Sequence, residues 1–538
     1  VPAKRAKRVG IVDELVHSAE LKEVALETAQ RLAIGWRPKR KGGGVAGLLL
    51  DHNRIGRSVV FRTARKQVLK KTSGHYPAPF AAMDAVRVGL NRGMKIGLQR
   101  EARHFAELAI GQISRNLVQI FFATTALKKD LGTDSDGVEL RPVSKVGIVG
   151  AGFMGAAIGG VAALKCATDV RFRDADWERL ARGLNLAKGV LKSSMKRRRI
   201  TRYEYRELVS LISGTTDWSG FGRTDLVIEA VFEDLSVKHE VFRQLEEVVS
   251  SDCVLASNTS TIPISKIASI AKRPERVVGM HFFSPVDRMP LLEVIATDDT
   301  DPSTTAPAVS FGRDMGKTVI VVRDRPGFWV NRILHPYTGE AGRLLEEGAA
   351  IEMIDRAMTS FGFPVGPITL LDEVGIDVAV KAGGVMEEAL GTTGPLETLK
   401  RVVASGRLGR KSGRGFYRYE KGKKRGVDQS VYEIIGARSG RVDETRARDR
   451  LVYSMLNEAA NAIGEDVVRS PRDGDIGAIF GIGYPPFRGG PLRYIDQLGV
   501  SNVVATLNSL ADTEGDRFRP VAILEEMASS NGRFYPSD

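Results

Sequence analysis

The stretch Lys145-Val-Gly-Ile-Val-Gly-Ala-Gly-Phe-Met-Gly155 decides the fold of this chain. Residues 145–149 are a short apolar run typical of a buried strand, and an alanine-rich helical segment follows the glycines. Gly150 permits a tight turn, Gly152 lets the backbone approach a pyrophosphate, and Gly155 allows the helix to pack closely on the strand. The stretch therefore predicts a dinucleotide-binding site at the N-terminus of the helix.

Short apolar runs alternate with helical stretches after this motif, which predicts an α/β fold with a Rossmann-type, doubly wound sheet. Asp174 follows the second run, about 20 residues after the glycines, where a carboxylate accepts the ribose hydroxyls of NAD and repels the 2′-phosphate of NADP. NAD is therefore the expected cofactor. The predicted strands are residues 146–149, 170–172, 226–230, 254–256, 277–280, 291–295 and 319–322.

Helical patterns replace the strand pattern after Pro326-Gly327, and they contain an internal repeat. Residues 367–375 match residues 491–499 at identical spacing, and an aromatic-proline pair precedes each copy. Two copies predict a duplicated all-α C-terminal domain. Asn331 and Asn457 are expected to open the corresponding helices of the two copies.

The chain is expected to divide into four parts. Residues 1–140 show mainly amphipathic helices, and the alternating pattern of the Rossmann domain covers residues 141–325. The two helical copies are expected at residues 326–425 and 426–538, with a surface connection at Gly422–Gly426.

Composition narrows the class of protein. A chain of 538 residues with 43% hydrophobic residues can bury several cores, so it needs no disulfide or metal to be stable. Cys166 and Cys253 are the only cysteines and lack the spacing of metal ligands, which favours a cytoplasmic protein without a metal site. No apolar run reaches the roughly 18 residues of a membrane-spanning helix.

The formal charge of +14 leaves three kinds of partner open: nucleic acid, an acidic membrane surface, or a polyanionic substrate such as a CoA thioester. The densest basic run, Lys192 with Lys196–Arg199, lacks the interleaved aromatic residues of a single-strand binding surface. The run is interpreted as a solvated helix face, with a contact to a CoA phosphate as the main alternative, and nucleic acid is not an expected partner.

His281 is the strongest candidate for proton transfer among 7 histidines. It ends an apolar run, at the edge where open α/β sheets bind ligands, and imidazole exchanges protons near neutral pH. Glu293 interrupts the next apolar run, where a carboxylate needs a partner, and pairing would fix the tautomer of His281. Ser260 and Asn331 are expected at the same edge, although each could instead be a helix N-cap.

Five motifs together resemble a known family: Gly150-Ala-Gly-Phe-Met-Gly155, Val227-Ile-Glu-Ala-Val-Phe-Glu233, Ala256-Ser-Asn-Thr-Ser260, Gly279-Met-His-Phe-Phe-Ser-Pro-Val286 and Pro326-Gly-Phe-Trp-Val-Asn-Arg332. With them, essentially the whole chain resembles the alpha subunits of the bacterial fatty-acid β-oxidation complex and their mitochondrial trifunctional relatives. The resemblance implies a 3-hydroxyacyl-CoA dehydrogenase, which oxidises an L-3-hydroxyacyl-CoA to the 3-ketoacyl-CoA with NAD and without a metal.

The resemblance also implies roles for individual residues. His281 and Glu293 match the catalytic pair, whereas Ser260, Asn331 and Phe480 match substrate-binding positions. Phe480 replaces a tyrosine found in some members, and Ser284 replaces an asparagine found in many. The residues implied to contact NAD are Gly150, Gly152, Met154, Gly155, Asp174, Val231, Phe232, Glu233, Lys238, Ser260, Ser284 and Lys411.

The N-terminal part resembles the end of another domain. Residues 6–13 are similar to the closing segment of an enoyl-CoA hydratase/isomerase domain, and residues 76–79 to part of the linker helices that follow it. The hydratase glutamates of the family lie upstream of such a segment. We therefore expect a truncated start at Val1, a bifunctional full-length parent, and no hydratase activity in this chain.

The resemblance implies a thiolase (beta) subunit as partner in a hetero-oligomer. An alternative is that the chain is a non-catalytic scaffold that binds the thiolase, with the Rossmann domain as a relic. Intact Asp174, His281 and Glu293 argue against this alternative.

Overall fold

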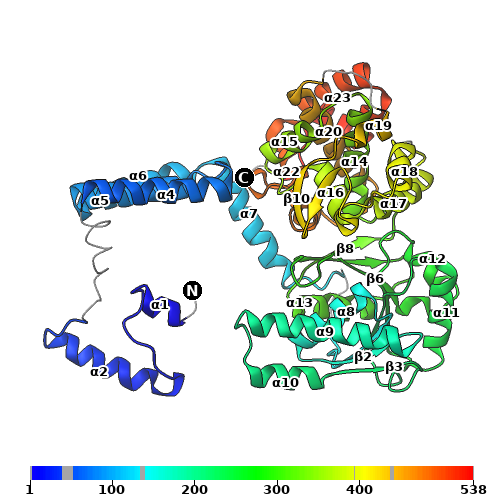
Figure 1. Ribbon diagram of the computed structural model, residues 1–538, viewed down its shortest axis with the longest axis horizontal. Helices are drawn as coiled ribbons and strands as arrows, with labels where there is room; N and C mark the ends of the chain where they lie inside the picture. The colour runs from blue at the N-terminus through cyan, green and yellow to red at the C-terminus, as the bar shows by residue number, and fades with distance from the viewer. Residues whose placement is uncertain are drawn as a thin grey trace. The chain divides into compact units, whose positions relative to one another are not determined.

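The central sheet contains all the predicted strands and one more, β3 (Figure 1). In the computed structural model, which describes residues 3–38, 53–133, 138, 140–392, 394–436 and 442–536, the strand order is β3-β2-β1-β4-β5-β6-β7-β8. The strands are β1 (Lys145–Val149), β2 (Asp169–Arg173), β3 (Ile212–Thr215), β4 (Leu226–Glu229), β5 (Val254–Ser257), β6 (Val277–Phe282), β7 (Leu291–Ala296) and β8 (Thr318–Arg323).

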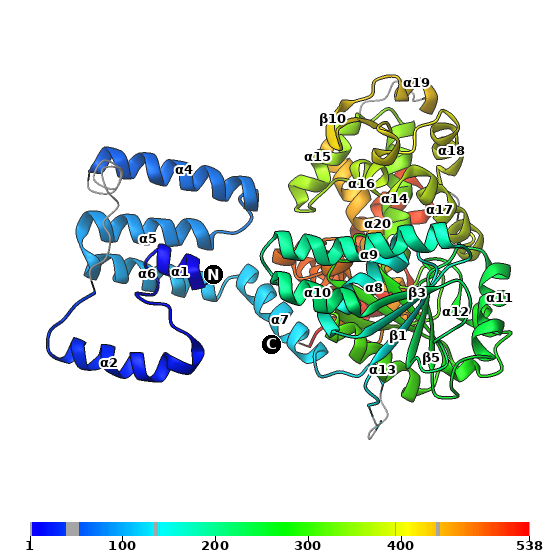
Figure 2. The ribbon, with the colours of Figure 1, turned by 60° about the horizontal axis from the view of Figure 1, so that its bottom comes forward.

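Helices cover both faces of this sheet, so the predicted doubly wound fold is confirmed. Successive residues of β4 alternate between two cores, with Leu226 and Ile228 in one and Val227 in the other. Figure 2 shows α9 and α10 on one side of the strands, and α11 and α12 on the other. The helices are α8 (Phe153–Cys166), α9 (Trp177–Lys196), α10 (Arg202–Ser210), α11 (Leu235–Glu246), α12 (Ile264–Ala268) and α13 (Pro302–Asp314).

The direction of the strands changes within the sheet. All strands from β3 to β6 pair in parallel, but β7 pairs antiparallel with β6, and β8 runs parallel to β7. The connection from β6 to β7 holds no crossover helix, and a parallel pair would require one. The reversal places His281 directly opposite Glu293 in the ladder.

The C-terminal half is helical and gathers above the sheet in Figure 1. Its two longest helices, α14 and α20, pack against each other. Its helices are α14 (Val330–Glu346), α15 (Ile351–Phe361), α16 (Pro367–Val374), α17 (Ile376–Leu390), α18 (Leu396–Ala404), α19 (Val431–Ile435), α20 (Glu444–Gly464), α21 (Pro471–Gly481), α22 (Pro491–Leu498), α23 (Val500–Glu514) and α24 (Ala522–Ser530).

Matching hydrogen bonds confirm that this half is duplicated. Asp355 of α15 accepts hydrogen bonds from backbone N–H groups in the first turn of α16, and Asp475 of α21 does the same for α22. The hydroxyl of Tyr417 donates to Asp355 over 2.8 Å, and that of Tyr535 donates to Asp475 over 2.7 Å. Each copy therefore fixes its short third helix by one buried aspartate and one tyrosine.

Two local expectations about this half are wrong. Gly422–Gly426 is not only a connection, because β9 (Tyr417–Glu420) and β10 (Lys423–Val427) pair as an antiparallel hairpin. Asn457 does not open a helix but lies inside α20, where its amide donates to the carbonyl of Arg519. Asn331 is the second residue of α14, as expected of a residue that opens a helix.

Residues Val1–Leu108 form a compact unit separate from Ala109–Asp538. The first unit contains α1 (Ala3–Arg8), α2 (Leu21–Ala33), α4 (Arg54–Thr72), α5 (Ala78–Arg92) and α6 (Met94–Ala109). The next helix, α7 (Gln112–Leu127), packs against α21 and β8 of the second unit. Among the helices that the structure describes, none is long and apolar enough to cross a membrane.

Candidate active site

His281 and Glu293 form a buried pair where β6 and β7 run side by side. The Nδ1 atom of His281 lies 2.6 Å from Oε2 of Glu293, and their side chains are 7% and 0% exposed. A carboxylate accepts but cannot donate when ionised, so Nδ1 carries the hydrogen and Nε2 keeps a lone pair. This arrangement leaves Nε2 free to accept a proton from a ligand.

The second oxygen of Glu293 binds the start of the helical half. Oε1 accepts hydrogen bonds from the backbone nitrogens of Trp329 (3.2 Å) and Val330 (2.9 Å), so the carboxylate caps α14. A negative charge at a helix N-terminus is stabilised by the unpaired N–H groups and by the helix dipole. The capping turn contains Phe328 with φ of 51°, a left-handed conformation that a bulky residue rarely adopts.

The imidazole of His281 has two aromatic neighbours. Its ring centre lies 4.4 Å from that of Phe283 and 5.8 Å from that of Phe328. The amide of Asn331 donates to the carbonyl of Ser260 over 2.9 Å and thus joins α14 to the loop after β5. Ser260 is not a helix N-cap, because Pro263 precedes α12. The hydroxyl of Ser260 instead donates to Oε1 of Glu233 over 3.5 Å.

The glycine turn fits a dinucleotide pyrophosphate. A Cβ atom on Gly150 would lie 2.6 Å from the carbonyl oxygen of Ala230, and one on Gly155 would lie 2.0 Å from the carbonyl oxygen of Gly150. A Cβ atom on Gly152 would meet nothing within 4 Å. Two glycines therefore serve packing, and Gly152 lies beside open space at the N-terminus of α8, where N–H groups can bind a phosphate.

Asp174 lies beside the glycine turn, where the ribose of a dinucleotide is expected. Its two carboxylate oxygens accept hydrogen bonds from the backbone nitrogens of Ala151 (2.8 Å) and Ala175 (2.7 Å). The neighbouring Arg173 places its guanidinium 4.0 Å from the ring centre of Trp218. This cation–π contact holds the guanidinium of Arg173, the residue next to Asp174, against the indole ring.

The loops after β4 and β5 are joined by Glu233. Its Oε1 atom accepts hydrogen bonds from the hydroxyl of Thr259 (2.6 Å) and the backbone nitrogen of Ser260 (2.9 Å). Phe232, next to it, is 75% exposed, and Val231 is half-buried. The predicted residues of these two loops thus form one connected surface at the carboxyl ends of the strands.

Other predicted residues lie around this surface or away from it. Met154 is half-buried in the first turn of α8, and Ser284 is exposed just after β6. Lys238 is buried in α11. Phe480, in α21, packs partly buried against the larger core. Lys411 forms a salt bridge with Asp377 of α17, and the described contacts of Lys411 include no predicted site residue.

The contact between Lys381 and Glu233 was not predicted from the sequence. Its Nζ atom donates to the carbonyl of Glu233 over 2.8 Å and so joins α17 to the loop after β4. The two residues are 148 positions apart, and no local pattern links them. Within the described part of the chain, no group of three or more histidine, cysteine or acidic residues could hold a metal ion.

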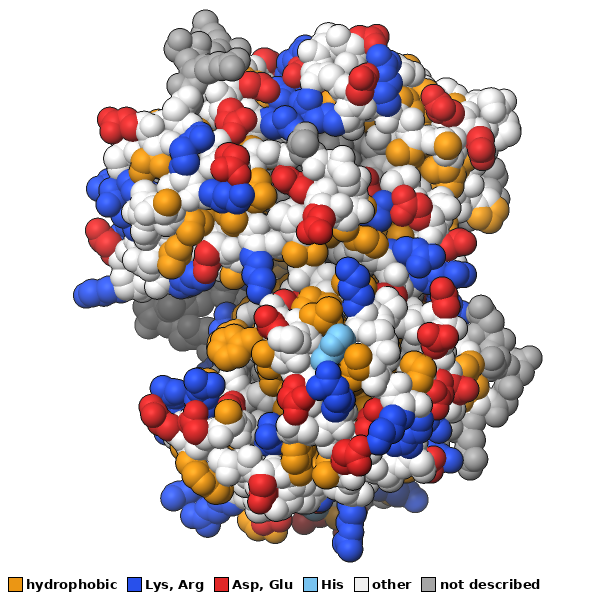
Figure 3. Space-filling model, turned by 90° about the vertical axis from the view of Figure 1, so that its right-hand side faces the viewer, with side chains coloured by type: hydrophobic (Ala, Val, Ile, Leu, Met, Phe, Trp, Pro, Cys, Tyr) orange, Lys and Arg blue, Asp and Glu red, His pale blue; other side chains and the backbone are white. Residues whose placement is uncertain are grey.

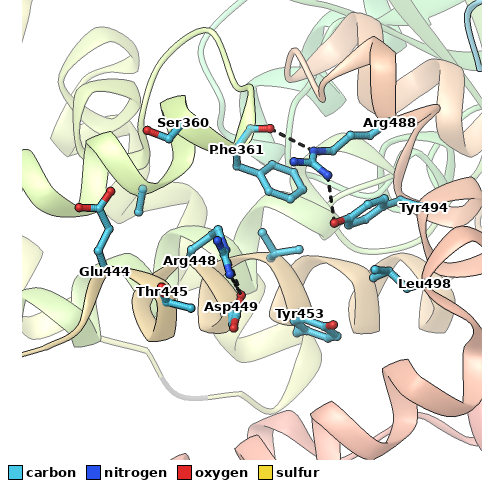
Figure 4. A pocket seen from close by; sticks show the side chains of 12 residues that line it. Ser360, Phe361, Glu444, Thr445, Arg448, Asp449, Tyr453, Arg488, Tyr494 and Leu498 are labelled. Atoms are coloured by element: carbon cyan, nitrogen blue, oxygen red, sulfur yellow. Dashed lines mark hydrogen bonds and ion pairs between the residues drawn. The ribbon is translucent and has the colours of Figure 1, made fainter. Parts of the chain in front are cut away.

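Figure 3 shows one face of the molecule, on which positive and negative side chains are interspersed and hydrophobic side chains gather near the middle. A cavity of about 550 Å³ lies between α15, α20 and α22 (Figure 4). There the guanidinium of Arg488 stacks 3.9 Å from the ring centre of Phe361 and donates to the hydroxyl of Tyr494. None of the predicted site residues lines this cavity.

Comparisons with known proteins give a consistent result. Residues 145–325 match the family model of the NAD binding domain of 3-hydroxyacyl-CoA dehydrogenase, and residues 327–419 match that of its C-terminal domain. The fatty acid oxidation complex subunit alpha of Shewanella loihica is 45% identical over 537 residues, which are 99% of this chain and 75% of the relative.

Solved structures show the same similarity. The 3-hydroxybutyryl-CoA dehydrogenase of Escherichia coli K12 matches with a TM-score of 0.64 and 28% identity, over 72% of this chain and 99% of that one. The dehydrogenase part of multifunctional enzyme 1 from Caenorhabditis elegans matches with a TM-score of 0.55 and 25% identity, over 76% of this chain and 98% of that one.

Proposed function

We propose, because this chain belongs to the family of fatty acid oxidation complex alpha subunits, that His281 and Glu293 are its catalytic pair. The chain is an NAD-dependent 3-hydroxyacyl-CoA dehydrogenase that oxidises an L-3-hydroxyacyl-CoA to the 3-ketoacyl-CoA in fatty-acid oxidation. The 2.6 Å contact between Nδ1 of His281 and Oε2 of Glu293 is the observation that carries the assignment.

The pair performs proton transfer. Nε2 of His281 takes the proton of the substrate hydroxyl, while Glu293 keeps the hydrogen on Nδ1 and stabilises the imidazolium that forms. NAD, when bound, supplies the hydride acceptor. In the reverse direction, protonated His281 donates to the ketone oxygen. The apolar rings beside the imidazole lower the local dielectric and strengthen its interaction with Glu293.

The remaining site residues divide between cofactor and substrate. The glycine turn and Asp174 would hold the pyrophosphate and ribose of NAD. Ser260, Asn331 and Phe480 are proposed to bind the acyl-CoA, which the bond from Asn331 to the Ser260 carbonyl supports for the first two. The proposed NAD contacts also include Met154, Val231, Phe232, Glu233, Ser260, Ser284 and Lys411.

We propose the domain division 1–140, 141–325, 326–425 and 426–538. The family matches at residues 145–325 and 327–419 support the two central divisions. The first part is proposed to be the end of a hydratase/isomerase domain with its linker helices. Its described elements are helices.

A thiolase subunit is the proposed partner, since the relative from Shewanella loihica is named as the alpha subunit of a complex. We propose a cytoplasmic location, because Cys166 and Cys253 are both free thiols.

The function is tested by following the NADH absorbance band with acetoacetyl-CoA as substrate. Oxidation of NADH that stops when acetoacetyl-CoA is left out is the expected result. A folded protein that binds a thiolase subunit but leaves NADH unchanged would instead support the scaffold alternative.

A further inference from the structure

The cavity shown in Figure 4 lies between the two helical copies, and the dehydrogenase reaction does not use it. One wall comes from α15 of the first copy, and the others come from α20 and α22 of the second. Its volume of about 550 Å³ is within the range of pockets that hold small molecules. A ligand bound there would touch both copies at once.

Arg488 brings a positive charge to the lining of this cavity. Its Nε atom donates to the carbonyl of Phe361 and its Nη1 atom to the hydroxyl of Tyr494, each over 3.0 Å. The guanidinium lies 3.9, 5.2 and 5.0 Å from the ring centres of Phe361, Phe487 and Tyr494. All these partners are neutral, so no carboxylate compensates the charge of Arg488 within the described part of the chain.

The acidic side chains of the lining already have partners. Oε2 of Glu444 lies 2.8 Å from Nη2 of Arg356, and Oδ1 of Asp449 lies 2.9 Å from Nη2 of Arg448. Each of these pairs cancels its own charge. The charge that remains uncompensated in the lining is that of Arg488, which suits a ligand with one negative charge.

The rest of the lining offers hydroxyl donors and apolar surface. The hydroxyl of Tyr494 accepts from Arg488, so its own hydrogen remains to be donated. Burial raises the pKa of Tyr494, so this group keeps its proton at neutral pH. Tyr453 adds a second phenol, and Val452 and Leu498 add aliphatic surface from α20 and α22.

We propose that this cavity is a second ligand site, which binds a monocarboxylate with an apolar body. Nη1 of Arg488 keeps one N–H and Nη2 keeps two, and the parallel pair at the end of the guanidinium matches the two oxygens of a carboxylate. The hydroxyl of Tyr494 donates to the same group, and the apolar body packs against Val452 and Leu498. A phosphate could use the same donors, but at neutral pH it carries more negative charge than Arg488 can balance.

Three probes with the same eight-carbon chain test the headgroup: octanoate, octyl phosphate and octanol. Binding is measured by isothermal titration calorimetry, and thermal melting confirms folding. Arg488→Met removes the charge, and Arg488→Lys keeps it without the planar fork. Thr445→Trp fills part of the cavity from an exposed position on α20. Arg519→Met is the matched control, because Arg519 pairs with two aspartates on the surface of the same copy.

Octanoate should bind at one site per chain and raise the melting temperature, since it binds the folded protein. Octanol and octyl phosphate should bind at least about tenfold more weakly, because one has no charge and the other has too much. Arg488→Met should weaken octanoate binding by about 10- to 100-fold and Arg488→Lys by severalfold. Thr445→Trp should weaken it by about tenfold or more, and Arg519→Met should bind as the wild type does.

Other outcomes would overturn the inference. Wild-type affinity for octanoate in Arg488→Met or in Thr445→Trp would mean that octanoate binds outside the cavity. Octanol as tight as octanoate would mean that the site recognises only the apolar chain, and tighter octyl phosphate would make it a phosphate site. If Arg488→Met does not fold, Arg488→Lys and Thr445→Trp decide. Absence of octanoate binding in the wild type would refute this site and leave the dehydrogenase function untouched.

Discussion

Oε1 of Glu293 lies 2.9 Å from the backbone nitrogen of Val330. The carboxylate that orients His281 is therefore also the cap of the first helix of the next domain. A change at this one side chain should affect catalysis and stability together, because the two oxygens serve different segments of the chain.

Glu293→Gln tests this double role. An amide has only one acceptor oxygen, so the variant keeps the bonds from α14 only by turning its NH₂ group towards Nδ1 of His281. That favours the wrong tautomer of His281, and the neutral amide no longer stabilises an imidazolium. We expect kcat to fall by about 10²–10⁴-fold and the protein to lose about 1–3 kcal/mol of stability. Steady-state kinetics and thermal melting measure the two effects. A lower melting temperature with an unchanged kcat would mean that Glu293 acts only as the N-terminal cap of α14 and not in catalysis.

His281→Gln should remove proton transfer but keep the cofactor site. The described contacts of the His281 side chain are with Glu293 and two phenylalanine rings, and none is with the glycine turn. We expect kcat to fall by about 10²–10⁴-fold while NADH affinity changes by less than about threefold. Stopped turnover together with lost NADH binding would argue against the assigned role.

Two glycine variants should fail in different ways. Gly152→Ala places a Cβ atom in open space, so it should fold normally but weaken NADH binding, since it obstructs the approach of the pyrophosphate. Gly155→Ala places a Cβ atom 2.0 Å from a backbone oxygen, so it should lower the melting temperature. Gly189→Ala in α9 also meets open space and serves as the control. Unaltered NADH affinity in Gly152→Ala would place the pyrophosphate elsewhere.

The buried aspartate of the second helical copy should make stability depend on pH. Burial raises the pKa of Asp475 from 3.8 to about 7, although hydrogen bonds from Tyr535 and the first turn of α22 oppose this. The folded-state pKa is thus above the unfolded one, so the contribution of this group to stability is complete below the unfolded pKa and is lost as pH rises towards the folded one.

Asp475→Asn should remove this dependence. Between pH 5 and pH 8 the variant should gain roughly 2–3 kcal/mol relative to the wild type, because the asparagine never ionises. Thermal melting at both pH values measures the difference, with the exposed Asp298→Asn as a control. A constant difference between variant and wild type across this range would show that Asp475 does not titrate there.

Features with a local signal could be read from the sequence. The glycine spacing predicted the turn before α8, and the position of Glu293 within an apolar run predicted that it pairs with His281, because a buried carboxylate requires a partner. The repeat at residues 367–375 and 491–499 predicted the duplication of the helical half.

Features that arise from contacts between distant segments could not be read in this way. The pairing of Lys238 with Glu229 had no local signal, because it depends on how α11 packs against β4. The reversal of β7 has no signature in a strand that is apolar on both faces. The placement of Asn457 within α20 was missed because the helix begins at Glu444, a full three turns earlier than in the first copy.

The contact between α14 and α20 has a consequence for assembly. These helices belong to the two helical copies, yet one polypeptide joins them, so their association is intramolecular and has a high effective concentration. Diluting the protein cannot separate them, and the melting of this half should not shift with protein concentration. Partial unfolding of either copy would expose the apolar face of the other to water. The two copies should therefore unfold together in one cooperative transition.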